Sequence, residues 1–328
     1  MTARIAIVGT GGTFAMEARH PFDWVEYGES GIVRPIADLL EGATAGLDVA
    51  LAPVDFRALG STGITPADWL DLARLVQGIE ADGCVITHGT ATLEETAFFL
   101  SLVHGGDMPV VLTGAQRPAN TAGSDALANL RAALAVAAAP QARGLGVLVV
   151  IDNLIFAARD VTKDSSGALD AFVAGEFGPL GRVEADGSIS LRRAVPRTQL
   201  PVDLGEAIAG GASGLPRVDI AYSYAGADGA AIEAFVSAGA RGIVSAGLLP
   251  GRPANGEAPA LAAAAEQGVI VVQATRGARG NVVSQAFLDR AGVLAGGDLS
   301  PQKLRIVVML VLALGGDAAT LSAVLQAI

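Results

Sequence analysis

Short runs of β-branched and other apolar residues alternate with alanine- and leucine-rich stretches over the first half of this 328-residue chain. Such nearly continuous apolar runs, separated by helical segments, are typical of a parallel sheet that is covered on both faces. The predicted strands are residues 5–8, 49–54, 83–87, 110–113 and 147–151, and the predicted helices are residues 36–41, 66–78, 93–103 and 125–138. The pattern therefore predicts an α/β fold with a large parallel sheet in the N-terminal part.

The alternation stops after Phe172 and starts again at Val218. Between them, residues 175–195 are typical of a hairpin whose turn is Ala185-Asp186-Gly187. The segment that follows is rich in proline, glycine and alanine and has no clear period, which indicates a linker. We therefore expect an N-terminal α/β domain at 1–195, a linker at 196–216 and a smaller C-terminal α/β domain at 217–328.

The charge balance argues against several classes of partner. The chain has 33 acidic and 22 basic residues, which gives a net charge of −11. A surface this negative repels phosphate backbones and anionic lipid, so we expect neither nucleic acid nor a membrane as partner. The apolar run at 306–314 is far shorter than the roughly 20 residues that span a bilayer. The first residues read as a core strand rather than a signal peptide, so a cytoplasmic location is expected.

The loops that follow the predicted strands are rich in threonine and glycine, and ligands of open α/β sheets bind beyond the carboxyl ends of the strands. The first loop lacks the third glycine of a dinucleotide-binding turn, because that position is Phe14. The chain has no H-E-x-x-H zinc motif and no G-x-S-x-G serine elbow, and the single Cys84 excludes a cysteine zinc site. These observations predict neither a cofactor nor a metal, and they leave a threonine as the candidate nucleophile.

A threonine hydroxyl is a weak nucleophile unless a base takes its proton, and a desolvated lysine is one such base. Only two of the 22 basic residues are lysines, Lys163 and Lys303. Since arginine cannot release its proton, a lysine retained in such a chain is a candidate base. The plain alternative is a surface lysine with no special role.

At this point the sequence resembles the bacterial-type L-asparaginase/glutaminase family. The resemblance covers nearly the whole chain in family order and rests on several segments together. These segments are Thr10-Gly11-Gly12-Thr13, the stretch 86–97 around His88-Gly89-Thr90, Leu112-Thr113-Gly114-Ala115 with Arg117-Pro118, the strand 146–150, Arg159-Asp160-Val161-Thr162-Lys163, Ile243-Val244-Ser245-Ala246-Gly247 and Pro301-Gln302-Lys303.

The resemblance implies two threonine centres and no cofactor. Thr13 matches the family nucleophile, and Tyr27 matches the tyrosine of the mobile lid. Thr90 and Lys163 match the second threonine and its lysine. Ser61 matches the serine that holds the substrate α-carboxylate. The resemblance also implies a small-molecule amide as substrate and self-association as a homodimer or homotetramer.

The site has two departures from the family pattern. Ala91 stands where the family has an aspartate, and Thr62 stands where it has a glutamine, so both contacts to the substrate ammonium are weakened. Gly89 still leaves room for substrate beside Thr90. We expect a soluble amidohydrolase that forms a threonine acyl-enzyme. One alternative is an enzyme of the same mechanism that acts on an amide, ester, lactone or imide without an α-amino group. Another is a non-catalytic protein that binds a small ligand.

Four further residues have structural interpretations. Thr92 and Glu95 fit a capping box for the helix that follows the His88 loop. Asp125 is expected to cap the next helix rather than to replace the missing acid. His88 is expected to be a buried, hydrogen-bonded structural histidine.

Overall fold

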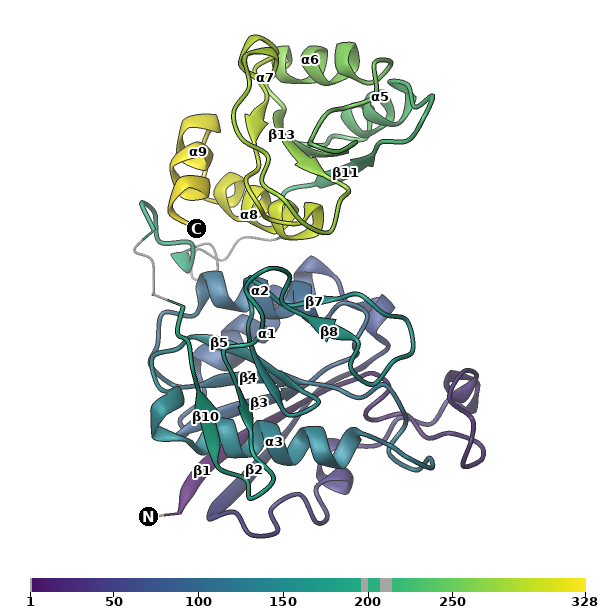
Figure 1. The fold of residues 1–328 in the computed structure, drawn as a ribbon, viewed down its shortest axis with the longest axis vertical. Helices are drawn as coiled ribbons and strands as arrows, with labels where there is room; N and C mark the ends of the chain where they lie inside the picture. Colours follow the sequence, from purple (N-terminus) through teal and green to yellow (C-terminus); the bar gives the residue numbers. More distant parts are fainter. Residues whose placement is uncertain (1, 196–199, 207–213) are drawn as a thin grey trace. The chain divides into compact units, whose positions relative to one another are not determined.

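The computed structural model describes residues 2–195, 200–206 and 214–328. The chain divides into two compact units, Met1–Arg197 and Thr198–Ile328. Residues 196–199 and 207–213 of the expected linker lie outside the described part. Each unit is an α/β structure of its own (Figure 1).

The first unit is built on an eight-stranded sheet in the order β10-β9-β6-β5-β4-β3-β1-β2. Its strands are β1 (Ala3–Gly11), β2 (Val49–Leu59), β3 (Gly83–Thr87), β4 (Val110–Thr113), β5 (Val147–Ile151), β6 (Leu154–Ala157), β9 (Gly181–Val183) and β10 (Ile189–Leu191). The five strands from β2 to β5 are parallel, as expected. The predicted hairpin is present as β9 and β10, which pair antiparallel and extend the sheet beyond β6.

The sheet is mixed because the chain reverses directly after β5. Asp152 and Asn153 form a tight turn with positive φ angles of 50° and 59°, so β6 returns antiparallel to β5. Asn and Asp tolerate this left-handed backbone better than most residues. The parallel part of the sheet therefore ends at β5, and the strands that follow form an antiparallel edge.

The order in which the chain adds parallel strands to the sheet reverses at β1. From β1 the chain goes to β2 on one side and then to β3 on the other, so β1 and β3 are neighbours at a switch point. The carboxyl ends of these strands lie in register, since Gly9 pairs with Thr87 and Thr87 pairs with Thr113. Such a switch point opens a crevice at the carboxyl edge of the sheet, where ligands of α/β proteins bind.

Helices cover both faces of this sheet (Figure 1). They are α1 (Pro66–Gln77), α2 (Leu93–Val103) and α3 (Ala126–Ala138), with short 3-10 turns η1 (Tyr27–Ser30), η2 (Ile36–Leu39), η3 (Ser61–Gly63) and η4 (Pro140–Ala142). The apolar side of α3 packs on Ile5, Ile7 and Val85. Thr65 caps α1 and Pro66 occupies its first turn. The site threonines therefore lie above a closely packed core.

A two-stranded antiparallel ribbon, β7 (Thr162–Lys163) and β8 (Phe172–Val173), lies between β6 and β9 in the chain. The second unit is a four-stranded parallel sheet in the order β11-β12-β13-β14. Its elements are β11 (Val218–Tyr222), α5 (Ala230–Ser237), β12 (Gly242–Gly247), α6 (Ala258–Glu266), β13 (Ile270–Thr275), α7 (Ala286–Arg290), β14 (Leu294–Ala295), α8 (Pro301–Ala313) and α9 (Ala318–Ala327). Ile232, Leu261 and Leu288 pack on one side of this sheet. Among the described residues no helix is long and apolar enough to cross a membrane.

Candidate active site

Three loops meet at the switch point because glycines let their backbones touch. Gly12 has a φ of 73°, and a Cβ atom on it would lie 2.4 Å from the Cα of Gly89. A Cβ atom on Gly89 would in turn lie 2.3 Å from the Cβ of Ser61. Real Cβ atoms do not approach this closely, so glycine is needed at both positions. The loop after β1, the loop after β3 and the turn after β2 are therefore in direct contact, which brings the surroundings of Thr13, Thr90 and Ser61 together.

Thr13 lies directly after β1 and is almost completely buried. Its hydroxyl oxygen is 2.7 Å from the phenol oxygen of Tyr27, and the two groups share one hydrogen bond. Tyr27 comes from η1, at the far end of a loop that leaves the sheet after Met16. Thr13 and Tyr27, which match the nucleophile and the lid tyrosine of the family, are thus in direct contact through a buried hydroxyl and a phenol.

Thr90 lies after β3, with an exposed fraction of 6%. The Lys163 amine donates a hydrogen bond of 2.7 Å to the Thr90 hydroxyl. Burial lowers the pKa of Lys163 below its ordinary value, and the negative charge of Asp125 offsets part of that lowering. The amine is therefore easier to deprotonate than an exposed lysine and already lies on the hydroxyl that it would activate.

The backbone of Lys163 is fixed as well as its side chain. Lys163 belongs to β7, where it pairs with Phe172. Its backbone N–H donates a 2.6 Å hydrogen bond to Oε2 of Glu94, a buried carboxylate in the first turn of α2. Glu94 therefore fixes the backbone of Lys163, a role that the sequence did not predict.

Thr92 has a different role from the predicted one. Its side chain makes no capping bond to α2, so the predicted capping box is wrong. The hydroxyl instead donates a 2.7 Å hydrogen bond to the backbone oxygen of Ser61. The close contact of Gly89 with Ser61 brings that carbonyl within reach, and a long-range partner therefore replaces the local one. Thr92 holds Ser61 in place at the site.

The two positions that depart from the family pattern lie at the surface of this region. Thr62 follows Ser61 in η3, and Ala91 follows Thr90. Both side chains are exposed, whereas Ser61 is half-buried. The structure therefore brings the eight predicted site residues to one edge of the sheet and divides them into buried hydroxyls and an exposed rim.

Asp125 precedes α3 but does not cap it with its side chain, so that prediction is also wrong. Its carboxylate accepts hydrogen bonds from the backbone N–H groups of Gln116 and Arg117, at 2.9 Å and 3.0 Å. A third bond of 3.0 Å comes from the side-chain amide of Asn129. Asp125 therefore shapes the loop after β4, and its negative charge offsets part of the lowering of the Lys163 pKa.

His88 is fully buried beneath the Thr90 loop, as expected of a structural histidine. Its two ring nitrogens contact the Gly89 carbonyl at 2.8 Å and the Thr96 hydroxyl at 3.0 Å. Trp69 donates a bond of 2.9 Å to the same hydroxyl. Burial lowers the pKa of His88 to about 4, so the ring is neutral near pH 7. His88 supports the loop and has no free nitrogen for catalysis.

Residues 17–32 form a loop that carries Tyr27, and we refer to this loop as the lid. Its two ends are joined, because Met16 bridges with Val33 and the N–H of Glu17 donates to the carbonyl of Ile32 at 3.1 Å. Within the lid, the buried carboxylate of Asp23 accepts bonds from the side chain of Arg19 and the N–H of Glu26, each at 3.0 Å. The lid is therefore a closed, internally bonded unit.

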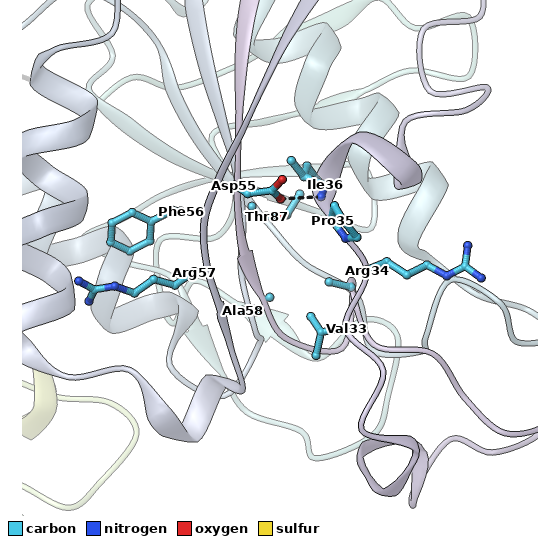
Figure 2. Close-up of a pocket in the computed structure, with 12 residues that line it drawn as sticks. Val33, Arg34, Pro35, Ile36, Asp55, Phe56, Arg57, Ala58 and Thr87 are labelled. Carbon is cyan, nitrogen blue, oxygen red and sulfur yellow. Dashed lines mark hydrogen bonds between the residues drawn. The ribbon is translucent and has the colours of Figure 1, made fainter.

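A pocket of about 200 Å³ lies where the lid returns to the sheet. Figure 2 shows the segment 33–36 on one side and β2 on the other, with the carboxylate of Asp55 turned toward Ile36. Oδ1 of Asp55 accepts the N–H of Ile36 at 2.8 Å, and Ile36 is buried against Gly9 of β1. None of the eight predicted site residues lines this pocket. It marks the place where the C-terminal end of the lid is anchored.

The described residues contain no group of three histidine, cysteine, aspartate or glutamate side chains arranged to hold a metal ion. The polar groups at the site are hydroxyls, one amine and carboxylates that bind backbone N–H groups. This arrangement is suited to nucleophilic attack by a hydroxyl with proton transfer between fixed partners.

Comparison with known proteins gives matches along the whole chain. The family model described as "Asparaginase, N-terminal" matches residues 4–197, and the one described as "Glutaminase/Asparaginase C-terminal domain" matches residues 217–325. L-asparaginase 2 of Bacillus subtilis is 35% identical over 95% of this chain and 83% of its own length. The glutaminase-asparaginase of Acinetobacter glutaminasificans is 36% identical over 96% of both chains. The crystal structure of a "Probable Cytoplasmic L-asparaginase" from Campylobacter jejuni aligns with a TM-score of 0.89 and 32% identity, covering 99% of this chain and 100% of that one.

Proposed function

This chain belongs to the asparaginase family, and from that premise we propose that it hydrolyses a side-chain amide through an acyl-enzyme on Thr13. As a member of the family it is a hydrolase of carbon–nitrogen bonds in linear amides, acting on L-asparagine or a close analogue. The observation that carries the mechanism is the bond between the Thr13 hydroxyl and Tyr27, at the switch point of the sheet.

In the first half of the reaction, Oγ1 of Thr13 attacks the amide carbon while its proton passes toward the phenol of Tyr27. The carbon–nitrogen bond then breaks, and the nitrogen leaves as ammonia after it has taken up a proton. The acid remains as an ester on Thr13. Backbone N–H groups in the glycine-flanked loops are suited to stabilise the negative oxygen that forms on the way.

In the second half, water attacks the ester and restores the Thr13 hydroxyl. Thr90 and Lys163 are the proposed partners for the proton of this water, since the amine already contacts the hydroxyl at 2.7 Å. Lowering of the Lys163 pKa by burial supports this role, because a base must lose its proton before it can accept another. Ser61 is the proposed contact of the substrate carboxylate, and Gly89 packs directly against it.

The test is release of ammonia from a panel of amides, L-asparagine, L-glutamine and succinamate, by the natural sequence and by Tyr27→Phe. We expect turnover of at least one amide and a fall in kcat of about a hundredfold or more in the variant, as for loss of a proton-transfer group. Full activity of Tyr27→Phe would contradict the role of Tyr27. Absence of turnover on every amide would favour the non-catalytic alternative.

A second candidate is a hydrolase of an amide, ester, lactone or imide without an α-amino group. Ala91 and Thr62 favour it, because they offer a methyl and a neutral hydroxyl to the part of the substrate where an ammonium would lie. An unpaired buried ammonium is expensive. Asp125 is a poor replacement, since its oxygens already bind Gln116, Arg117 and Asn129.

The proposed function includes self-association as a homodimer or homotetramer and a cytoplasmic location. The family resemblance over residues 217–328 motivates the first, and the similarity to a protein titled as cytoplasmic motivates the second. A relative titled as periplasmic also exists, in Haemophilus influenzae. Light scattering that gives a stable, active monomer would contradict the assembly, and fractionation of cells would test the location.

A further inference from the structure

We infer that Asn120 is a positioning residue that holds the lid down and thereby keeps Tyr27 on Thr13; the catalytic part of this inference rests on the proposed function. Asn120 lies in the loop between β4 and α3, 102 positions after Ala18 of the lid. Its side chain makes two hydrogen bonds to one lid residue. The Ala18 N–H donates to Oδ1 at 2.9 Å, and Nδ2 donates to the Ala18 carbonyl at 2.7 Å.

This paired contact replaces a strand pairing. Ala18 lies two residues after Met16, whose bridge with Val33 joins the two ends of the lid. One primary amide therefore satisfies both backbone groups of a residue that no longer has a partner strand. Loss of the amide would leave both backbone groups of Ala18 without these partners, and the N-terminal half of the lid would lose two of its hydrogen bonds.

Asn120 belongs to the loop 114–125 between β4 and α3, which we call the platform, and this loop is rigid. Asp125 binds two backbone N–H groups of this loop, and the Thr121 hydroxyl donates to the Pro118 carbonyl at 2.8 Å. The same loop makes two further contacts with the lid. The N–H of Ala122 donates to the Pro21 carbonyl at 2.8 Å, and the guanidinium of Arg117 lies 4.0 Å from the centre of the Trp24 ring.

The two ends of the lid are attached differently. The C-terminal end is bound to β2 through Asp55 and to the core through Ile36 (Figure 2). The N-terminal half lies on the platform through partly buried hydrogen bonds and the contact of Arg117 with Trp24, and its one small buried apolar side chain there is Ala18, so its opening exposes little apolar surface. Asn120 should therefore control the opening of the lid and not the overall stability of the fold.

Trp24 provides a direct measurement of this opening. The chain has two tryptophans, Trp24 on the lid and Trp69 in the core, with exposed fractions of 38% and 3%. Acrylamide quenches an exposed indole far more than a buried one, and a Trp24→Phe variant gives the signal of Trp69 alone for subtraction. The quenching of Trp24 reports the lid whether or not Thr13 is the nucleophile.

The experiment compares Asn120→Ala, Asn120→Asp and the control Gln141→Ala, which removes an exposed amide from η4. For Asn120→Ala we expect increased quenching of Trp24, an unchanged thermal midpoint and a fall in kcat of about ten- to thirty-fold. That fall is what loss of two ordinary hydrogen bonds gives. Asn120→Asp keeps only the acceptor for the Ala18 N–H and should fall between. Gln141→Ala should match the natural sequence in all three measurements.

The coupling to Tyr27 is tested in a double variant. In a Tyr27→Phe background, Asn120→Ala should lower kcat much less than in the natural sequence, because the group that it positions is already gone. Unchanged quenching in Asn120→Ala would overturn the attachment. Increased quenching with unchanged kcat, or full additivity in the double variant, would overturn the positioning of Tyr27. If Tyr27→Phe alone is fully active, the proposed function fails while the quenching still decides the attachment.

Discussion

The amine of Lys163 donates to the hydroxyl of Thr90 across 2.7 Å, although the two residues are 73 positions apart. Lys163 is held there from behind by the bond of its backbone N–H to Glu94. Burial and a hydroxyl partner are together what a lysine needs to act as a base, because burial disfavours its charged form and the hydroxyl gives it a proton to take.

The first prediction follows from the lowered pKa of Lys163. The fraction of neutral amine grows as the pH rises through that pKa, so kcat/KM should rise with pH along a limb that lies below the ordinary lysine range. Lys163→Arg keeps the charge but cannot release its proton, and we expect a loss of about 10² to 10⁴ fold, close to that of Lys163→Met. A pH–rate profile of the three proteins checks this. A fully active arginine variant would mean that Lys163 acts only as a charge.

The second prediction concerns the two threonines. Thr13→Ala and Thr90→Val should each lower kcat by at least about a thousandfold, as for loss of a member of a catalytic unit. Both side chains lie at loop ends, so the thermal midpoint should change little. Thr320→Ala, in the second unit, serves as a control that loses a hydroxyl bonded to Asp317. Near-normal turnover in either site variant, measured as ammonia release, would remove the role assigned to that residue.

The third prediction concerns the contact of Gly89 with Ser61. A methyl group at position 89 would lie 2.3 Å from Cβ of Ser61, so Gly89→Ala must displace the turn that carries Ser61. We expect KM to rise about tenfold or more, since the carboxylate contact is lost. Gly105→Ala is the matched control, because a Cβ atom there meets nothing within 4 Å. An unchanged KM in Gly89→Ala would show that Ser61 does not bind substrate.

The fourth prediction concerns substrate choice. Ala91→Asp should shift the ratio of kcat/KM for L-asparagine over succinamate toward asparagine by about a hundredfold, because it restores a charged partner for the ammonium. Ala91→Asn, of equal size and without charge, should shift it far less. A strong preference of the natural sequence for asparagine would contradict the second candidate function. An unmoved ratio in Ala91→Asp would contradict the argument from charge at this position.

Patterns along the chain predicted what depends on near neighbours. The apolar runs predicted the parallel strands, and the alanine- and leucine-rich stretches predicted α1, α2 and α3, because nearby residues decide both. The motifs also brought together pairs that prove to be in contact, Thr13 with Tyr27 and Thr90 with Lys163.

The wrong predictions share one cause. Thr92 and Asp125 stand where a helix cap would stand, yet each side chain bonds elsewhere. The Ser61 carbonyl and the N–H groups of Gln116 and Arg117 become available only once the loops are packed together. A local pattern cannot rank a distant partner against a near one. The role of Asn120 was missed for the same reason, since no pattern near Asn120 indicates that Ala18 is its partner.

The glycine contacts at the switch point separate two kinds of change that selection can make in this protein. The spacing of the loops that carry Thr13 and Thr90 depends on backbone contact between Gly12 and Gly89. A larger residue at either position would clash, so these two positions cannot change freely. The side chains of Thr62 and Ala91 are exposed and take no part in these glycine contacts. Their side chains can be exchanged without rebuilding the reaction centre. We therefore expect substrate preference to change through these two positions while the catalytic residues stay the same.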